Sequence, residues 1–104
     1  MFKQITVQEL NRQLEKNEIN LLDVREDFEL NICSIKGSIH IPMKQIGTRI
    51  NELFNKSEYA IICHSGVRSA MVCEYLLNLG YNVVNVRGGI DRWAEKIDKA
   101  MKRY

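Results

Sequence analysis

Short apolar runs alternate along this chain with segments of helical periodicity, at intervals of about twenty residues. The run at 19–24 is apolar apart from Asn20 and Asp23, which is typical of a strand buried on both faces of a parallel sheet. Strands that alternate with helical segments indicate βαβ units with right-handed crossovers. The pattern therefore predicts the α/β class, with one three-layer α/β/α domain around a mostly parallel sheet of about five strands.

Local patterns predict the individual elements. Thr6 followed three residues later by Glu9 forms a capping box, and apolar residues at helical spacing continue that helix to about residue 17. Gly80 ends a helix, and Gly88 and Gly89 open the last one, which Trp93 packs onto the sheet. The expected strands are 2–5, 19–24, 39–41, 59–63 and 83–86, and the expected helices are 7–17, 25–30, 43–55, 70–79 and 88–98.

Length and charge exclude several classes of protein. The chain of 104 residues is expected to form a single domain, 1–104, with a basic C-terminal tail at about 99–104 that frays. The formal net charge of +2 gives no footprint for nucleic acid, and the apolar runs are too short to cross a membrane. The N-terminus lacks the apolar core of a signal peptide, so we expect a cytoplasmic protein.

The cysteine pattern indicates a reduced protein without a metal or other cofactor. Three cysteines without a Cys-x-x-Cys spacing argue against a disulfide scaffold and a zinc site, and the two histidines complete no ligand set. Cys73 falls among apolar residues of a helix, which indicates core packing. His40, just before Pro42, is expected to serve as hydrogen-bonded structure rather than as a catalytic base.

The segment 63–69, Cys-His-Ser-Gly-Val-Arg-Ser, carries the most chemistry. It lies between a strand and an amphipathic helix, so Cys63 faces a helix N-terminus, where backbone N–H groups and the helix dipole stabilise an anion. A thiolate is such an anion, and it is the nucleophilic form of cysteine. Gly66 permits a tight turn, Arg68 adds a permanent positive charge, and Ser65 and Ser69 are expected to cap the helix. A reactive, anion-binding loop is therefore favoured over a cysteine that only ends a core strand.

The chain resembles the rhodanese-like domain family, and specifically its single-domain sulfurtransferases, over about residues 5–97. Each matching motif is short, but their combination in one order is specific. The motifs are 21–25 (Leu-Leu-Asp-Val-Arg), 35–42 (Ile-Lys-Gly-Ser-Ile-His-Ile-Pro), 63–69 as the active loop, and 86–89 (Val-Arg-Gly-Gly) with Trp93. One departure is Cys33-Ser34, where the family often has Gly-His; a second redox cysteine and a plain loop substitution are both open here.

The resemblance implies a reaction and the residues that perform it. Cys63 would be the nucleophile that takes a sulfane sulfur from thiosulfate or a persulfide donor, becomes a persulfide, and passes the sulfur to a thiol or cyanide. A thioredoxin-like or sulfur-relay protein is a further expected partner. Neither a nucleic acid nor a membrane is an expected partner. Backbone N–H groups of the loop would hold the terminal sulfur as an oxyanion hole would, and Arg68 would balance the charge of the donor. The implied donor-binding positions are His64, Ser65, Gly66, Val67, Arg68 and Ser69.

Asp23 and Arg25 are similar to a pair that lies beside the active loop in this family. They would either support the loop or form a buried salt bridge with each other, because alternation along a strand puts both side chains on one side.

Two other classes of function fit parts of the pattern. Cysteine-dependent phosphatases and arsenate reductases also place a cysteine and an arginine around an anion-binding loop, usually with five residues between them, whereas four separate Cys63 from Arg68. A non-catalytic rhodanese-like interaction module would usually lack the cysteine. Within sulfur transfer, a relay that receives persulfide sulfur from a protein donor is a further alternative.

Overall fold

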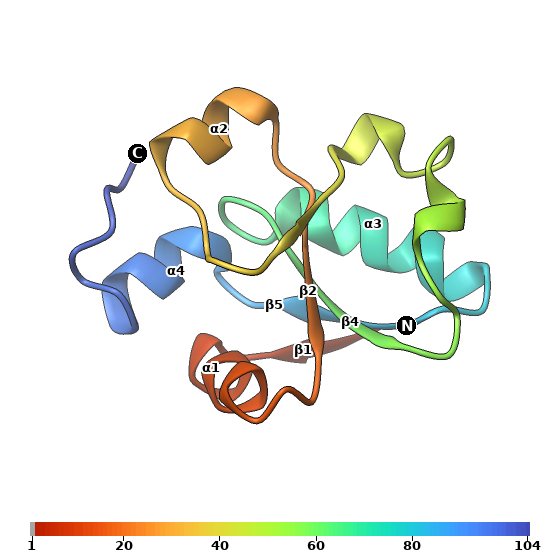
Figure 1. Ribbon diagram of the computed structural model, residues 1–104, viewed down its shortest axis with the longest axis horizontal. Coiled ribbons are helices and arrows are strands. Elements are labelled where there is room, and N and C mark those ends of the chain that lie inside the picture. Colours follow the sequence, from red (N-terminus) through yellow and green to blue (C-terminus); the bar gives the residue numbers. More distant parts are fainter. Residues whose placement is uncertain (1) are drawn as a thin grey trace.

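The computed structural model describes residues 2–104 and contains a five-stranded sheet in which every pairing is parallel (Figure 1). The strand order is β1-β5-β4-β2-β3, so β4 lies in the middle of the sheet. This confirms the predicted α/β class and its parallel sheet. The strands are β1 (Lys3–Ile5), β2 (Asn20–Asp23), β3 (Ile39–His40), β4 (Glu58–Ile62) and β5 (Asn82–Val86).

Helices cover both faces of the sheet and bury two separate apolar clusters (Figure 1). Successive residues of a strand point to opposite faces, so Ile61 of β4 packs under α3 and Ile62 packs under α1 and α4. Trp93 joins the second cluster, as predicted. The helices are α1 (Val7–Glu15), α2 (Asp27–Ile32), α3 (Val67–Asn78) and α4 (Gly89–Lys96).

The start of α1 shows how local sequence sets an element. The Thr6 hydroxyl accepts from the Glu9 N–H at 3.1 Å, and the Glu9 carboxylate accepts from the Thr6 N–H at 2.9 Å. This confirms the predicted capping box, which satisfies two N–H groups that the helix itself leaves without acceptors.

The prediction of one helix over 43–55 is wrong. The structure has two 3₁₀ turns, η1 (Met43–Gln45) and η2 (Ile50–Glu52), joined by a turn. Gly47 lies in the middle of the segment, and the β-branched Thr48 follows it, so the helix propensity is low where continuity would be needed. Ile46 and Leu53 are still buried, but Phe54 is 69% exposed. Burying two apolar anchors does not require an unbroken helix.

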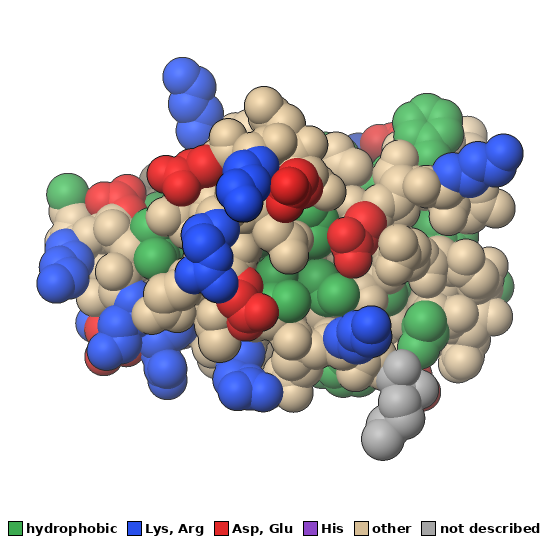
Figure 2. All heavy atoms as spheres, turned by 90° about the horizontal axis from the view of Figure 1, so that it is seen from below, with side chains coloured by type: hydrophobic (Ala, Val, Ile, Leu, Met, Phe, Trp, Pro, Cys, Tyr) green, Lys and Arg blue, Asp and Glu red, His purple; other side chains and the backbone are tan. Residues whose placement is uncertain are grey.

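Charged side chains of both signs are interspersed on the face seen from the α1 side (Figure 2). No single-sign field dominates that face, in keeping with the small net charge. Within residues 2–104, no helix has the length and apolar character needed to span a bilayer.

Candidate active site

Cys63 directly follows β4, at the carboxyl edge of the sheet, and its side chain is buried at 1% exposure. In open parallel sheets this edge is where ligands bind, because the loops and helix N-termini converge there. β4 pairs with β5 on one side and β2 on the other, so both neighbouring strands deliver residues beside the cysteine.

Three hydrogen-bond donors surround the Cys63 sulfur. The Gly66 N–H donates to Sγ at 3.1 Å and the Ser69 N–H donates at 3.3 Å. The Ser69 hydroxyl lies 3.3 Å from Sγ and can donate to a thiolate. Donors fixed by the backbone stabilise negative charge on the sulfur without having to reorganise. The loop therefore forms an anion cradle of the predicted kind.

The serine capping expected for α3 is wrong. The N-cap is Gly66, at φ +107°, and neither serine hydroxyl accepts a hydrogen bond from the first turn of the helix. The sulfur of Cys63 acts as the cap instead, since it accepts the N–H groups of Gly66 and of Ser69 in the first turn. The helix begins at Val67, three residues earlier than predicted.

The start of α4 supports the back of the loop. The Ile90 N–H donates to the Cys63 carbonyl at 2.8 Å, and the Asp91 N–H donates to the His64 carbonyl at 3.0 Å. Gly89 makes this approach possible, since a Cβ on it would lie 2.5 Å from the Cys63 carbonyl oxygen. Asn85 of β5 also donates to the Gly66 carbonyl, at 3.3 Å. Sequence reasoning did not single out Asn85; a buried amide within a strand otherwise made largely of valines is the signal that marks it.

The close approach at Gly89 makes a testable prediction. Gly89→Ala is expected to destabilise the fold by about 1–3 kcal/mol more than Gly37→Ala, because the new Cβ meets backbone oxygens that cannot give way. Gly37 is the matched control, since it also has a positive φ, but a Cβ on it would meet no atom within 4 Å. Urea denaturation of both variants checks this prediction. Equal losses of stability would show that the close approach of α4 to the loop leaves no less room for a Cβ at residue 89 than at residue 37.

Arg68 makes no hydrogen bond to the Cys63 sulfur and forms a two-bonded ion pair with Glu29 of α2. Its Nη1 and Nη2 donate to the two carboxylate oxygens at 2.6 Å and 2.8 Å. The Glu29 side chain is 5% exposed, and the hydrogen bonds from Arg68 lower its pKa to about 2. Glu29 was not among the predicted residues. Its signal in the sequence is an acidic residue on the short helix that follows Asp23 and Arg25.

Asp23 and Arg25 form the buried salt bridge that strand alternation allows, at 2.8 Å and 0–1% exposure. Arg25 also donates to the Cys33 carbonyl at 2.8 Å, and its own carbonyl contacts His40 Nε2 at 2.7 Å. Neither Asp23 nor Arg25 has a hydrogen bond to Cys63 among the described residues; the pair ties β2 to α2. His40 is hydrogen-bonded structure, as predicted.

The C-terminal tail is expected from the sequence to fray, but in the structure Tyr104 packs against the loop. Its ring stacks on His64, with centroids 4.1 Å apart and 13° between the planes. Its hydroxyl donates to Glu29 at 2.7 Å and accepts from Arg25 at 3.0 Å. Burial raises the pKa of Tyr104 to about 12, so the hydroxyl keeps its proton at neutral pH. The tail is basic overall, but it is held against the domain by Tyr104, by the ion pair of Arg103 with Asp91 and by the packing of Met101 against the second apolar cluster.

The other predicted positions lie around this arrangement. Cys73 is fully buried in the cluster under α3, which confirms core packing, and burial raises its pKa to about 12. Cys33 ends α2 and is partly exposed. Ser65 and Val67 are exposed on the rim of the loop. In the part of the chain that the structure describes, no cluster of three His, Cys, Asp or Glu residues could hold a metal ion.

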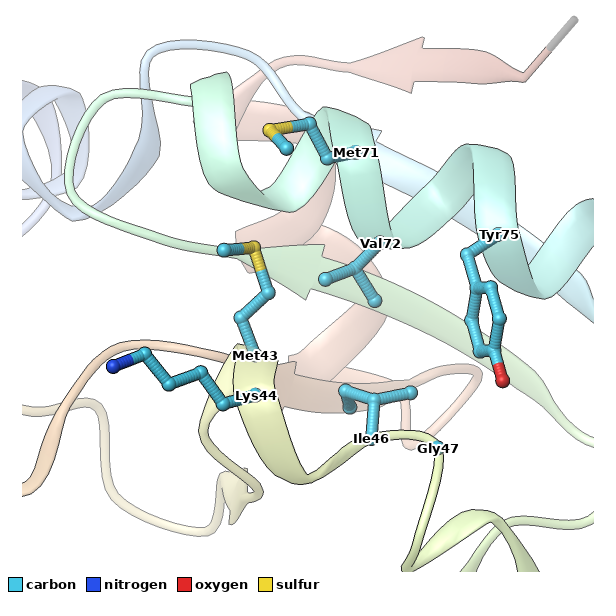
Figure 3. A pocket seen from close by; sticks show the side chains of 7 residues that line it. All are labelled: Met43, Lys44, Ile46, Gly47, Met71, Val72 and Tyr75. Carbon is cyan, nitrogen blue, oxygen red and sulfur yellow. The ribbon is translucent and has the colours of Figure 1, made fainter.

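A groove of about 440 Å³ lies beside the site, between η1 and α3 (Figure 3). Its lining is apolar apart from Lys44 and the hydroxyl of Tyr75, and it contains no nucleophile. Cys63 is not among its lining residues, which are Met43, Lys44, Ile46, Gly47, Met71, Val72 and Tyr75. The groove therefore offers no candidate nucleophile, and the candidate site remains the loop.

The fold and the loop together define a class of protein: a parallel α/β domain that presents one cysteine in an anion cradle at the carboxyl edge of its sheet. The family model described as "Rhodanese-like domain" matches residues 6–96. This chain belongs to the rhodanese-like domain family.

Known relatives agree with this membership. The chain is 40% identical over 92 residues to the Bacillus subtilis protein named "Putative sulfurtransferase YtwF", covering 88% of this chain and 89% of that protein. It is 35% identical over 96 residues to a sulfurtransferase of Allochromatium vinosum, covering 90% of each. The crystal structure of a rhodanese-like domain protein from Staphylococcus aureus superposes with a TM-score of 0.86 at 36% identity, covering 99% of each chain. Relatives with sulfurtransferase names support sulfur transfer as the general activity.

Proposed function

We propose that this protein is a sulfurtransferase of the thiosulfate sulfurtransferase (rhodanese) type. It moves a sulfane sulfur from thiosulfate or a persulfide donor to a thiol or cyanide through a persulfide on Cys63. The observation that carries the proposal is the convergence of the Gly66 N–H, the Ser69 N–H and the Ser69 hydroxyl on Sγ. Such a cradle stabilises a thiolate before transfer and a negatively charged terminal sulfur after it.

The reaction divides into two displacements at sulfur. The Cys63 thiolate attacks the sulfane sulfur of the donor, a new S–S bond forms, and the bond between that sulfur and the rest of the donor breaks. Sulfite or a thiol leaves. The acceptor then attacks the outer sulfur of the persulfide, and the Cys63 thiolate is restored. The protein supplies position and charge stabilisation and returns to its starting state.

The residues of the loop support distinct parts of this reaction. His64, Ser65, Gly66, Val67, Arg68 and Ser69 form the donor-binding rim, and only Gly66 and Ser69 contact the sulfur directly. Asp23 and Arg25 are supporting residues, since they fix α2, which holds Arg68 through Glu29.

The phosphatase alternative is disfavoured by the same geometry. A phosphatase of this kind needs its arginine to bind the equatorial oxygens of the phosphate, whereas both nitrogens of the Arg68 fork are engaged by Glu29. An interaction module is disfavoured because it would have no use for a cradled cysteine.

A reducing compartment such as the cytoplasm suits a reactive thiol. A thioredoxin-like or sulfur-relay protein would then fit as an acceptor.

Intact-mass measurement tests the proposal directly. The wild-type protein is incubated with thiosulfate or with glutathione persulfide, and the mass is recorded before and after cyanide is added. We expect a gain of one sulfur atom, located on the peptide that contains Cys63, and its loss as thiocyanate on addition of cyanide. Hydrolysis of an aryl phosphate without any gain of sulfur would support the phosphatase alternative instead.

A further inference from the structure

Two arginines and two carboxylates form one cluster next to the loop, in which Asp23, Arg25 and Glu29 are buried and Arg68 is partly exposed. Arg25 pairs with Asp23, Arg68 pairs with Glu29, and the Tyr104 hydroxyl bridges Arg25 and Glu29. With a neutral tyrosine, the charges of the four ionised groups cancel. The cluster therefore carries no net formal charge, and the positive charge of Arg68, which also interacts with Cys63, is largely balanced by Glu29.

Glu29 is tightly committed to this arrangement. It accepts two hydrogen bonds from Arg68 and one from Tyr104, and its side chain is 5% exposed. Releasing Arg68 toward a bound donor would leave this carboxylate buried without its cation, which is strongly unfavourable. Its lowered pKa means that it stays ionised at neutral pH, so protonation does not free Arg68 either.

The charge of the donor then determines how well it reacts. Thiosulfate carries two negative charges, so its approach to the Cys63 thiolate brings three negative charges together, which a free cation nearby would favour. A thiol persulfide in its protonated form, R–S–SH, brings no charge on the sulfur that is attacked. The Cys63 thiolate attacks the outer sulfur, the S–S bond of the donor breaks, and RS⁻ leaves and takes a proton from water, while Cys63–S–SH forms. The backbone donors of Gly66 and Ser69 are sufficient for that single charge.

We propose that Glu29 is a specificity-determining residue, which neutralises Arg68 and so favours thiol persulfides over thiosulfate, and that Tyr104 is the positioning residue that keeps it in place. The inference rests on the proposed sulfurtransferase function and assigns its donor class. Tyr104 joins the loop and α2 in one contact, through its ring on His64 and its hydroxyl on Glu29.

The test compares kcat/KM for thiosulfate with kcat/KM for the persulfide of 2-mercaptoethanol, which has no charged group in its protonated form, with cyanide as acceptor in both arms. Glu29→Gln keeps the shape and an acceptor oxygen but removes the charge. It is expected to raise the thiosulfate-to-persulfide ratio about tenfold, mainly through a lower KM for thiosulfate. Glu52→Gln is the matched control, because it removes the charge from another two-bonded arginine pair, with Arg49, on the exposed surface. Its ratio is expected to equal that of the wild type.

Tyr104→Phe gives a second, milder measurement. It keeps the ring that stacks on His64 and removes only the hydroxyl, so the ratio is expected to rise by about twofold to threefold. If Glu29→Gln does not fold, the donor ratio of Tyr104→Phe alone tests the inference. An unchanged ratio in folded Glu29→Gln, or in Tyr104→Phe when it alone folds, overturns the inference while leaving the proposed function in place. If Cys63 of the wild-type protein gains sulfur from neither donor, both the inference about Glu29 and the proposed sulfurtransferase function are wrong.

Discussion

Replacing Cys63 by serine is expected to reduce sulfur transfer by at least about 1000-fold, from thiosulfate and from glutathione persulfide alike. A serine hydroxyl remains protonated at neutral pH and forms no persulfide. The fold is expected to persist within about 1 kcal/mol, because the hydroxyl can accept the same N–H groups of Gly66 and Ser69. Thiocyanate formation measures the loss, and urea denaturation measures the stability.

Cys33→Ser is the matched control for this substitution. Cys33 is partly exposed at the end of α2; its carbonyl accepts from Arg25 at 2.8 Å, whereas its sulfur lies 3.9 Å from Nη1 of the same arginine. We therefore expect turnover to stay near the wild-type rate. A clear loss in Cys33→Ser would restore the hypothesis of a second redox cysteine, and a native rate in Cys63→Ser would show that the nucleophile is assigned wrongly.

The second large effect is expected at Asp23. Asp23→Ala leaves the guanidinium of Arg25 buried at 0% exposure without its carboxylate, which is expected to destabilise the fold by about 3–5 kcal/mol. The neutral partners of Arg25, the carbonyls of Cys33 and Glu29 and the Tyr104 hydroxyl, do not replace a negative charge. Thermal or urea denaturation measures the loss.

Glu52→Ala provides the comparison for Asp23→Ala. It also removes the carboxylate from an arginine pair, but Arg49 and Glu52 are partly exposed, so water replaces the lost partner. The expected cost is below about 1 kcal/mol. If Asp23→Ala proved as mild as Glu52→Ala, the buried pair would not be holding β2 and α2 together.

Much of the fold could be predicted, because it rests on local patterns. The Thr6–Glu9 capping box, the strand around Ile61 and Ile62 and the helix after the loop are each specified within a few neighbouring residues. The prediction was wrong over 43–55, because apolar spacing alone does not distinguish one helix from two turns that bury the same anchors.

The candidate site also has a part that the sequence could predict and a part that it could not. The order strand, loop and helix was sufficient to mark Cys63 and the backbone donors around it, since these lie within seven residues of sequence. Sequence could not reveal that Arg68 pairs with Glu29, 39 residues away, or that Tyr104 reaches the same carboxylate from 75 residues away. No local pattern encodes contacts between such distant positions.

By itself, the sequence determined the parallel α/β architecture and the place of Cys63, the candidate nucleophile, because periodicity, caps and a strand-loop-helix motif act over short distances along the chain. The tertiary structure alone decided the charge around that nucleophile. Folding brings α2 and the tail against the loop, and there a buried carboxylate cancels the cation that the motif contains.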